Sequence, residues 1–282
     1  MIRTGTLTVE QEQIKLQSFL NMNGFSSAQI RSMKQYGGIT KDGEIIFTNA
    51  IVFKGDKISL ALCDENENSN GILPSDTPIN IAFENEDVLI VDKPYNMPTH
   101  PSHNHYEDSL ANAVMGYYKS QNQKFVFRCV TRLDRETSGL CVIAKNAYTH
   151  EFLKQKLHTD SFIREYTALV SGVVEKDGFI DAPIRRAEQS IITRIVAPDG
   201  DYAYTSYRVL ENRANQTLLR LRLKTGRTHQ IRVHMSHIGH SIVGDTLYGT
   251  PSNTRLCLHS SLVELPLPFS NETVKIISNP DF

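Results

Sequence analysis

The irregular order of strand-like and helix-like segments is the feature that most limits the fold of this chain. The clearest strand pattern alternates three leucines with three cations over residues 217–224: Leu219, Arg220, Leu221, Arg222, Leu223 and Lys224. Elsewhere, an apolar run is followed sometimes by a helical pattern and sometimes by another strand pattern. A doubly wound fold would need a repeated βαβ unit. We therefore predict an α+β fold with a mixed, largely antiparallel sheet and flanking helices.

Composition divides the chain into a small and a larger unit. Residues 64–78 are polar, acidic and rich in turn formers, which is typical of a linker. Before them, residues 14–20 and 28–33 show helical spacing, and residues 39–62 alternate short apolar runs with turns. We expect an N-terminal α/β module over residues 1–63. The remaining residues 79–282 are long enough to enclose a core of their own.

The larger unit mixes both kinds of element. Asp108 and Ser109 are candidate caps at the start of one helix, and Gly239 is a candidate end for another. The expected strands cover residues 87–92, 139–144, 166–174 and 217–224, and the expected helices cover residues 110–117, 147–157 and 231–238.

Charge and cysteine usage limit the class of protein. The formal net charge is -1, which is not the strongly basic charge typical of a nucleic-acid-binding protein. Residues 128–232 nevertheless hold 18 Lys or Arg against 12 Asp or Glu, so one surface could be positive, or the cations could simply be solvated. The four cysteines are dispersed, which indicates a reducing compartment: Cys63, Cys129, Cys141 and Cys257. Cys129 and Cys141 lie in apolar runs, where we expect them to be buried.

The chain shows no sign of a membrane or secreted protein. No apolar stretch approaches the ~18 residues that a transmembrane helix needs. The first residues also lack the apolar core of a signal peptide. We therefore expect a cytoplasmic protein.

Asp134 is the first candidate for chemistry. It lies in a polar turn, between Arg132 and Arg135, that leads into the strand expected at residues 139–144. Flanking arginines would keep the carboxylate ionised, and an ionised carboxylate in a cleft can act as a nucleophile or a base. The same pattern fits a surface aspartate that pairs with one of the two arginines, and the local sequence alone favours that interpretation.

Four segments together resemble a known family. They are LIVDKPYNMPTHPS (89–102), TRLDRETSGLCVIAKN (131–146), REYTALVSG (164–172) and TGRTHQIRVHMSHIGHSIVGDTLYG (225–249). Their content and order are similar to the motifs of the RluA-type pseudouridine synthases, and Leu258-His259-Ser260 resembles the short element that follows them. The resemblance runs from about residue 79 to the C-terminus.

The resemblance implies an enzyme that flips a uridine out of RNA and isomerises it without a cofactor or metal. Asp134 matches the catalytic aspartate, Tyr166 the tyrosine that packs on the flipped base and helps to remove the last proton, and Arg232 the arginine that pairs with the aspartate. Without the resemblance, Tyr166 would be interpreted as a core strand residue and Arg232 as a helix-surface cation.

The same resemblance suggests residues that bind RNA. Arg132 matches a residue that occupies the space of the flipped base. Five more residues are candidates for positioning the RNA, although Arg227 and His229 fit structural hydrogen bonds in a tight turn equally well: Lys93, Arg227, Thr228, His229 and Gln230.

The chain departs from the family pattern in places. Thr131 stands where the family usually has His before Arg-Leu-Asp, and Tyr95-Asn96 replaces a small residue and Gly. The N-terminal unit resembles the S4-type RNA-binding module in its helices, its turn and Gly55-Asp56. It is degenerate, because Lys15-Leu16-Gln17 replaces the usual arginine-rich opening.

Several functional alternatives stay open. The S4-like module favours large-subunit ribosomal RNA as the substrate, and transfer RNA is the other candidate. A non-catalytic RNA-binding or ribosome-assembly factor would keep the fold without turnover. Glycoside hydrolysis would need a second acid beside Asp134, for which Glu136 is a candidate. We expect a monomer.

Two histidine clusters invite a metal interpretation. They comprise His100, His103 and His105 in one case and His229, His234, His237 and His240 in the other. Neither cluster has an H-E-x-x-H pattern or a cysteine partner, so we expect no metal site.

Overall fold

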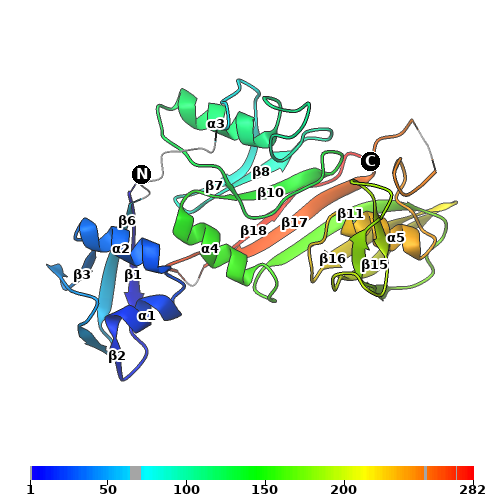
Figure 1. Cartoon of the computed structure of the whole chain (residues 1–282). Coiled ribbons are helices and arrows are strands. Elements are labelled where there is room, and N and C mark those ends of the chain that lie inside the picture. Colours follow the sequence, from blue (N-terminus) through cyan, green and yellow to red (C-terminus); the bar gives the residue numbers. More distant parts are fainter. Residues whose placement is uncertain (1, 64–70, 251–252, 271) are drawn as a thin grey trace.

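The computed structural model describes residues 2–63, 71–250, 253–270 and 272–282, and its architecture is α+β, as predicted (Figure 1). Much of the expected linker, residues 64–70, lies outside the described part. Residues 71–79 contain no helix or strand, and the chain there runs along a helix of the larger unit: the Ser75 amide donates to the Asn112 carbonyl (3.0 Å).

The N-terminal residues build their own small sheet. The sheet has the strand order β1-β6-β3-β4, with β2 and β5 paired separately. The elements are β1 (Ile2–Thr8), β2 (Gln13–Lys15), α1 (Leu16–Met22), α2 (Ser27–Gln35), β3 (Ile39–Lys41), β4 (Glu44–Ile45), β5 (Ile51–Phe53) and β6 (Lys57–Cys63).

The two helices expected near the N-terminus are present, with one correction. Helix α2 begins after Ser26, whose side chain and that of Gln29 form a capping box. Ile14, which we placed on the face of the first helix, instead lies in β2 opposite Val52. The helix cannot start earlier because the backbone of Lys15 is extended.

One ten-stranded sheet forms the larger unit. Its order is β12-β15-β16-β11-β17-β10-β8-β7, with β18 beside β17 and β9 beside β10. The pairs are antiparallel except β10 with β17. The strands are β7 (Asn80–Glu84), β8 (Val88–Lys93), β9 (Arg128–Cys129), β10 (Ser138–Ala144), β11 (Ile163–Ser171), β12 (Gly178–Asp181), β15 (Tyr204–Arg213), β16 (Gln216–Leu223), β17 (Leu258–Pro266) and β18 (Thr273–Ile277). The mixed, largely antiparallel sheet that we predicted is therefore confirmed.

Helices cover both faces of the central strands. Alternate residues of β8 and β10 enter two different cores, which explains why both strands are apolar throughout. One core receives α3 (Leu110–Ser120) and α5 (Gln230–His237), and the other receives α4 (Ala147–Lys156). A separate hairpin of β13 (Ile184–Arg186) and β14 (Arg194–Val196) lies beside α5.

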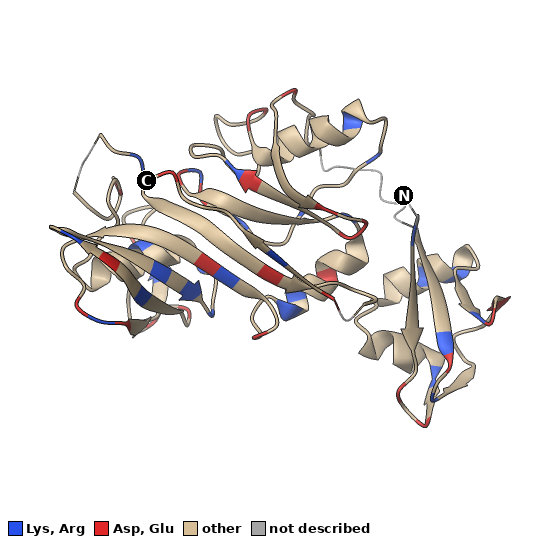
Figure 2. Cartoon of the chain, turned by 180° about the vertical axis from the view of Figure 1, so that it is seen from behind, with Lys and Arg blue, Asp and Glu red and all other residues tan. Residues whose placement is uncertain are grey.

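The alternation in β16 is also confirmed. Leu219 and Leu221 are buried, whereas Arg220 and Arg222 are exposed. These arginines lie near Glu165 of β11 and Asp160, at 3.7 and 3.4 Å. Figure 2 shows positive and negative residues mixed along the strands of this face, which fits solvated ion pairs better than a basic RNA track.

Two expectations need correction. The strand predicted to reach residue 174 ends at Ser171, because Gly172 has a φ of +80° that breaks the extended backbone. Cys141 is buried as expected, but Cys129 is partly exposed, because β9 borders a cleft.

The N-terminal unit is packed against the larger one through α4. The rings of Phe25 and Tyr148 stack with centroids 4.1 Å apart. Arg3 also makes two hydrogen bonds of 2.8 Å with the Asp87 carboxylate. Among all these described helices, none is long and apolar enough to cross a membrane.

Candidate active site

A cleft of about 760 Å³ collects the predicted site residues of the larger unit. Its walls come from the loop between β9 and β10, from β11, and from the turn that leads into α5. Lys93 is absent from its lining, but the other eight candidates border it: Arg132, Asp134, Tyr166, Arg227, Thr228, His229, Gln230 and Arg232.

The loop that carries Asp134 is held at its backbone. The Thr99 hydroxyl donates to the Leu133 carbonyl (2.7 Å) and accepts from the Leu133 amide (3.2 Å). The Thr137 amide donates to the Asp134 carbonyl (3.1 Å), which closes the turn. Asp134 is thereby fixed at the backbone while its side chain stays 29% exposed to the cleft.

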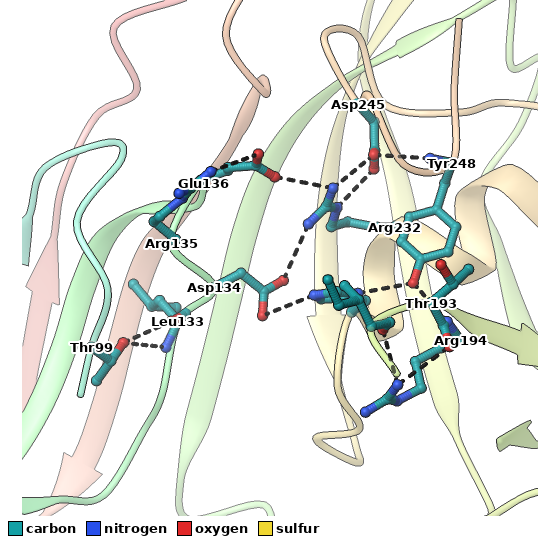
Figure 3. A network of polar contacts seen from close by, with 12 residues as sticks. Thr99, Leu133, Asp134, Arg135, Glu136, Thr193, Arg194, Arg232, Asp245 and Tyr248 are labelled. Carbon is teal, nitrogen blue, oxygen red and sulfur yellow. Dashed lines mark hydrogen bonds and ion pairs between the residues drawn. The ribbon is translucent and has the colours of Figure 1, made fainter. Parts of the chain in front are cut away.

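Each carboxylate oxygen of Asp134 faces one donor. Oδ2 lies 3.9 Å from Arg232 Nη1 (Figure 3). Oδ1 lies 3.9 Å from His229 Nε2. The local sequence favoured Arg132 or Arg135 as the cationic neighbour, whereas the family resemblance favoured Arg232. Within the described chain, no ion pair joins either of them to Asp134, and Arg135 instead approaches Glu136 (3.8 Å). The predicted closeness of Asp134 and Arg232 is present.

Arg232 is buried rather than on a helix surface. Its side chain is 2% exposed and makes two hydrogen bonds of 2.8 Å with Asp245. The same guanidinium lies 3.2 Å from Glu136 and over the ring of Tyr248. Burial alone would lower its pKa, but the hydrogen bonds and negative charges raise the pKa of Arg232 above its ordinary value. It is therefore a fixed positive charge beside Asp134.

Tyr166 lies on β11 and packs in the main core while its side chain borders the cleft. Burial, above all, raises the pKa of the Tyr166 hydroxyl. The phenol is therefore protonated at neutral pH, and its ring is a rigid wall for a bound base.

Lys93 has a different position from the one we predicted. Its ammonium is fully buried and donates to the carbonyls of Pro94 (2.9 Å), Met97 (2.8 Å) and Arg135 (3.3 Å). Burial lowers the pKa of Lys93 to about 8. The buried ammonium therefore connects the 94–97 loop to the Asp134 loop, and it does not line the cleft.

The residues before α5 fall into two groups. Arg227 and Thr228 are exposed at the cleft, as is Arg132 on the facing loop. Gln230 is buried, and its amide group bridges the Thr225 hydroxyl, the Arg227 amide and strand β15. Arg132 and Thr228 can reach a ligand. Arg227 is also exposed but donates from Nε to the Tyr202 carbonyl (3.0 Å), and Gln230 holds the turn in place.

Three residues of the site were not among our candidates for it. Asp245 and Tyr248 lie inside the long 225–249 motif, so the Gly-Asp-x-x-Tyr-Gly string was the available signal. Thr99 lies inside the 89–102 motif, but its role could not be predicted, because that role depends on a contact with a loop 34 residues away. Glu136, considered above as a second acid, forms an ion pair with Arg232. This pairing argues against glycoside hydrolysis.

Across the described ranges, no three His, Cys, Asp or Glu side chains are grouped to hold a metal ion. In the second histidine cluster, His234 is buried, and its ring nitrogens contact the Thr205 hydroxyl and the Ala182 carbonyl, both at 2.9 Å. That histidine is a structural hydrogen-bonding residue.

Comparison with solved structures identifies the class of fold. The human RNA pseudouridylate synthase domain containing 1 matches with a TM-score of 0.61 at 23% identity, covering 73% of this chain and 84% of that one. The human domain containing 4 matches with a TM-score of 0.58 at 22% identity, covering 71% and 88%. At this identity the likeness establishes the fold alone.

Sequence comparison establishes the family. The RNA pseudouridylate synthase family model matches residues 87–237. The uncharacterized RNA pseudouridine synthase YjbO of Bacillus subtilis is 35% identical, covering 89% of this chain and 90% of its own length. Ribosomal large subunit pseudouridine synthase D of Pseudomonas aeruginosa is 39% identical, covering 76% and 66%. This chain belongs to the RNA pseudouridylate synthase family, which confirms the resemblance in its motifs.

Proposed function

We propose that this RNA pseudouridine synthase isomerises uridine in large-subunit ribosomal RNA, with Asp134 as the nucleophile. The observation that carries the proposal is the Asp134 carboxylate, which lies in the cleft between Arg232 and His229 with no hydrogen bond consuming its oxygens in the described structure. Relatives named ribosomal large subunit pseudouridine synthase D support the choice of RNA. Transfer RNA is the alternative substrate.

The proposed reaction moves the glycosidic bond from nitrogen to carbon. A uridine flipped into the cleft stacks against Tyr166, which offsets part of the cost of unstacking. Asp134 attacks the ribose carbon, and uracil leaves through N1 with the bonding electrons. The uracil turns, C5 displaces the carboxylate, and the proton on C5 is lost while N1 gains one. Arg232 stabilises the carboxylate whenever it carries charge.

Tyr166 has a limited part in the last proton transfer. Because its pKa is raised, the hydroxyl carries a proton of its own when the C5 proton must leave. It can accept that proton only as it releases its own. We therefore propose that Tyr166 serves first as a stacking platform and second as a relay, with solvent as the final acceptor.

Exposed polar side chains at the cleft, two of them cationic, are proposed to position the RNA. Arg132 lies on one wall, and Arg227 and Thr228 lie on the other. Contacts of this kind orient the backbone and do not read its sequence. His229, Gln230 and Lys93 are proposed to act indirectly, through the loops that they hold.

The N-terminal residues are proposed to be an S4-like RNA-binding module over residues 1–63, joined by a linker over residues 64–78 to a catalytic domain over residues 79–282. The separate sheet and core support this division. We further propose that the protein is cytoplasmic and monomeric, and gel filtration tests the monomeric state.

Reversing the exposed charges of α2 with R31E and K34E tests whether the N-terminal module binds RNA. The two substitutions should weaken RNA binding and flatten its salt dependence. Unchanged binding would remove RNA binding from the role of the module.

The test of function is site-resolved pseudouridine mapping of total RNA from cells with and without the gene. A signal that disappears in the deletion strain should return with the wild-type gene and with Asp177→Asn, an exposed aspartate outside the cleft. Asp134→Asn should not restore it. If the map stays unchanged while the purified protein binds ribosomal RNA tightly, the protein is a binding factor rather than an enzyme.

A further inference from the structure

His229 has an uncommon backbone conformation that places its ring in the site. It directly precedes α5 and has a φ of 56°, in the left-handed region that residues with a side chain seldom adopt. Its ring is nearly buried between two partners. Nδ1 lies 2.8 Å from the Tyr248 hydroxyl, and Nε2 faces Asp134 Oδ1 at 3.9 Å. Strained backbone of this kind is concentrated at functional sites.

The hydrogen bonds at the Tyr248 hydroxyl indicate where the imidazole of His229 carries its proton. The backbone amide of Arg194 in β14 donates to the Tyr248 hydroxyl oxygen at 2.9 Å. A backbone N–H can only donate, so the tyrosine oxygen accepts there. Its own proton is then free for His229 Nδ1, and this is the direction that we infer for that hydrogen bond. An imidazole that accepts at Nδ1 carries its proton on Nε2 when it is neutral. That proton faces Asp134.

The charges around the ring agree with a neutral imidazole. Burial is the largest influence and lowers the pKa of His229, and the cations Arg232 and Arg194 lower it further. Asp134 and Asp245 act in the opposite direction, but the net shift is downward. Tyr248 keeps its proton, because burial raises the pKa of its hydroxyl.

The two neighbours of Asp134 therefore differ in kind. Arg232 is charged, and Asp245 and Glu136 hold it in place. His229 is a neutral donor with no acid of its own at hydrogen-bond distance in the described structure. At 3.9 Å neither neighbour makes a hydrogen bond, so the carboxylate keeps its lone pairs for attack. A neutral N–H can orient Oδ1 while reducing its nucleophilicity less than a second cation would.

We propose that His229 is a positioning residue for Asp134, presenting an Nε2–H to Oδ1, and that Tyr248 and the Arg194 amide fix this tautomer. The proposal rests on the proposed role of Asp134 as the nucleophile. It gives the β13–β14 hairpin a part in the site, because the relay begins at Arg194 and ends at the reacting carboxylate (Figure 3).

The first test reads the tautomer without any activity. In ¹⁵N-histidine-labelled protein at pH 7, the two nitrogen shifts of His229 should show a neutral ring protonated at Nε2. Tyr248→Phe should lose this tautomer preference, and Asp134→Asn should lower the pKa of His229 further, because it removes a charge that raises it. A ring protonated at Nδ1 in the wild type would overturn the proposal.

The second test measures turnover on the RNA identified by mapping. His229→Leu removes the donor and should reduce kcat by on the order of 100-fold with little change in KM, as expected for a misplaced reacting group. His229→Gln restores an N–H and should recover part of that loss. His237→Gln, on the exposed side of α5, is the matched control and should retain full activity.

The outcomes separate the two proposals. If the wild type modifies no RNA, the proposed function fails, while the tautomer measurement still stands. If the wild type is active and His229→Leu has an unchanged kcat, the positioning role fails. A loss confined to KM would assign His229 to RNA binding instead.

Discussion

Replacing Asp245 with Asn tests whether a buried ion pair holds Arg232 beside Asp134. The carboxylate of Asp245 is fully buried and accepts two hydrogen bonds of 2.8 Å from Arg232 and two more from the amides of Leu247 and Tyr248. Asn can keep the amide contacts but cannot accept from both guanidinium nitrogens. Breaking a buried pair costs roughly 3–5 kcal/mol. Because Glu136 remains near Arg232, we expect a loss of about 3 kcal/mol.

Urea unfolding of the purified variants measures this loss. Asp281→Asn is the matched control, since Asp281 also pairs with an arginine, Arg255, but is 70% exposed, and its loss should stay below about 1 kcal/mol. Equal losses for the two variants would refute the reasoning. The double variant R232M/D245L should recover only part of the stability, because its apolar pair has no desolvation cost but leaves the amides of Leu247 and Tyr248 without an acceptor, and it should lack activity.

Three further predictions concern the frame of the site. Because burial lowers the pKa of Lys93 from 10.5 to about 8, the unfolded chain binds a proton that the folded chain has released between these pH values. The free energy of unfolding should therefore rise by up to about 3 kcal/mol across that window, and Lys93→Met should abolish the rise in denaturant titrations at several pH values. Gly139→Ala should destabilise by about 3 kcal/mol or more, since φ is +106° and the added Cβ would lie 2.4 Å from the Ser260 carbonyl; an unchanged melting temperature would contradict this. Arg3→Ala should cost about 2 kcal/mol in urea unfolding by leaving Asp87 without its cation, and a cost near zero would mean that the two units are held by the aromatic contacts alone.

Periodicity was a good guide where burial alone decides the structure. The alternation of β16 and the continuous apolar runs of β8 and β10 were predicted from sequence, because one covered face or two covered faces leave different patterns. It was a poor guide at chain ends. Ile14 was assigned to a helix because its spacing from the next apolar residues fits one. Its pairing with Val52 in a sheet is a long-range contact, which local spacing cannot predict.

The members of the site were predictable from sequence, but most of their contacts were not. The resemblance named Asp134 and Arg232 and paired them, whereas the local sequence favoured the flanking arginines as partners of the aspartate. The structure gives that place to Arg232, which is 98 positions away along the chain, and gives Arg232 its own partner in Asp245. Lys93 shows the same limit, because sequence indicates a cation and cannot indicate that three carbonyls enclose it.

The position of β17 has a consequence for synthesis of the chain. This strand is inserted between β10, which follows the Asp134 loop, and β11, which carries Tyr166, so these two strands are not neighbours. A growing chain therefore makes β10 and β11 long before it makes the strand that joins them. Until Leu258–Pro266 has left the ribosome, the sheet exists as two halves with no shared edge. The Asp134 loop and Tyr166 can therefore belong to one continuous sheet only after Leu258–Pro266 has been made.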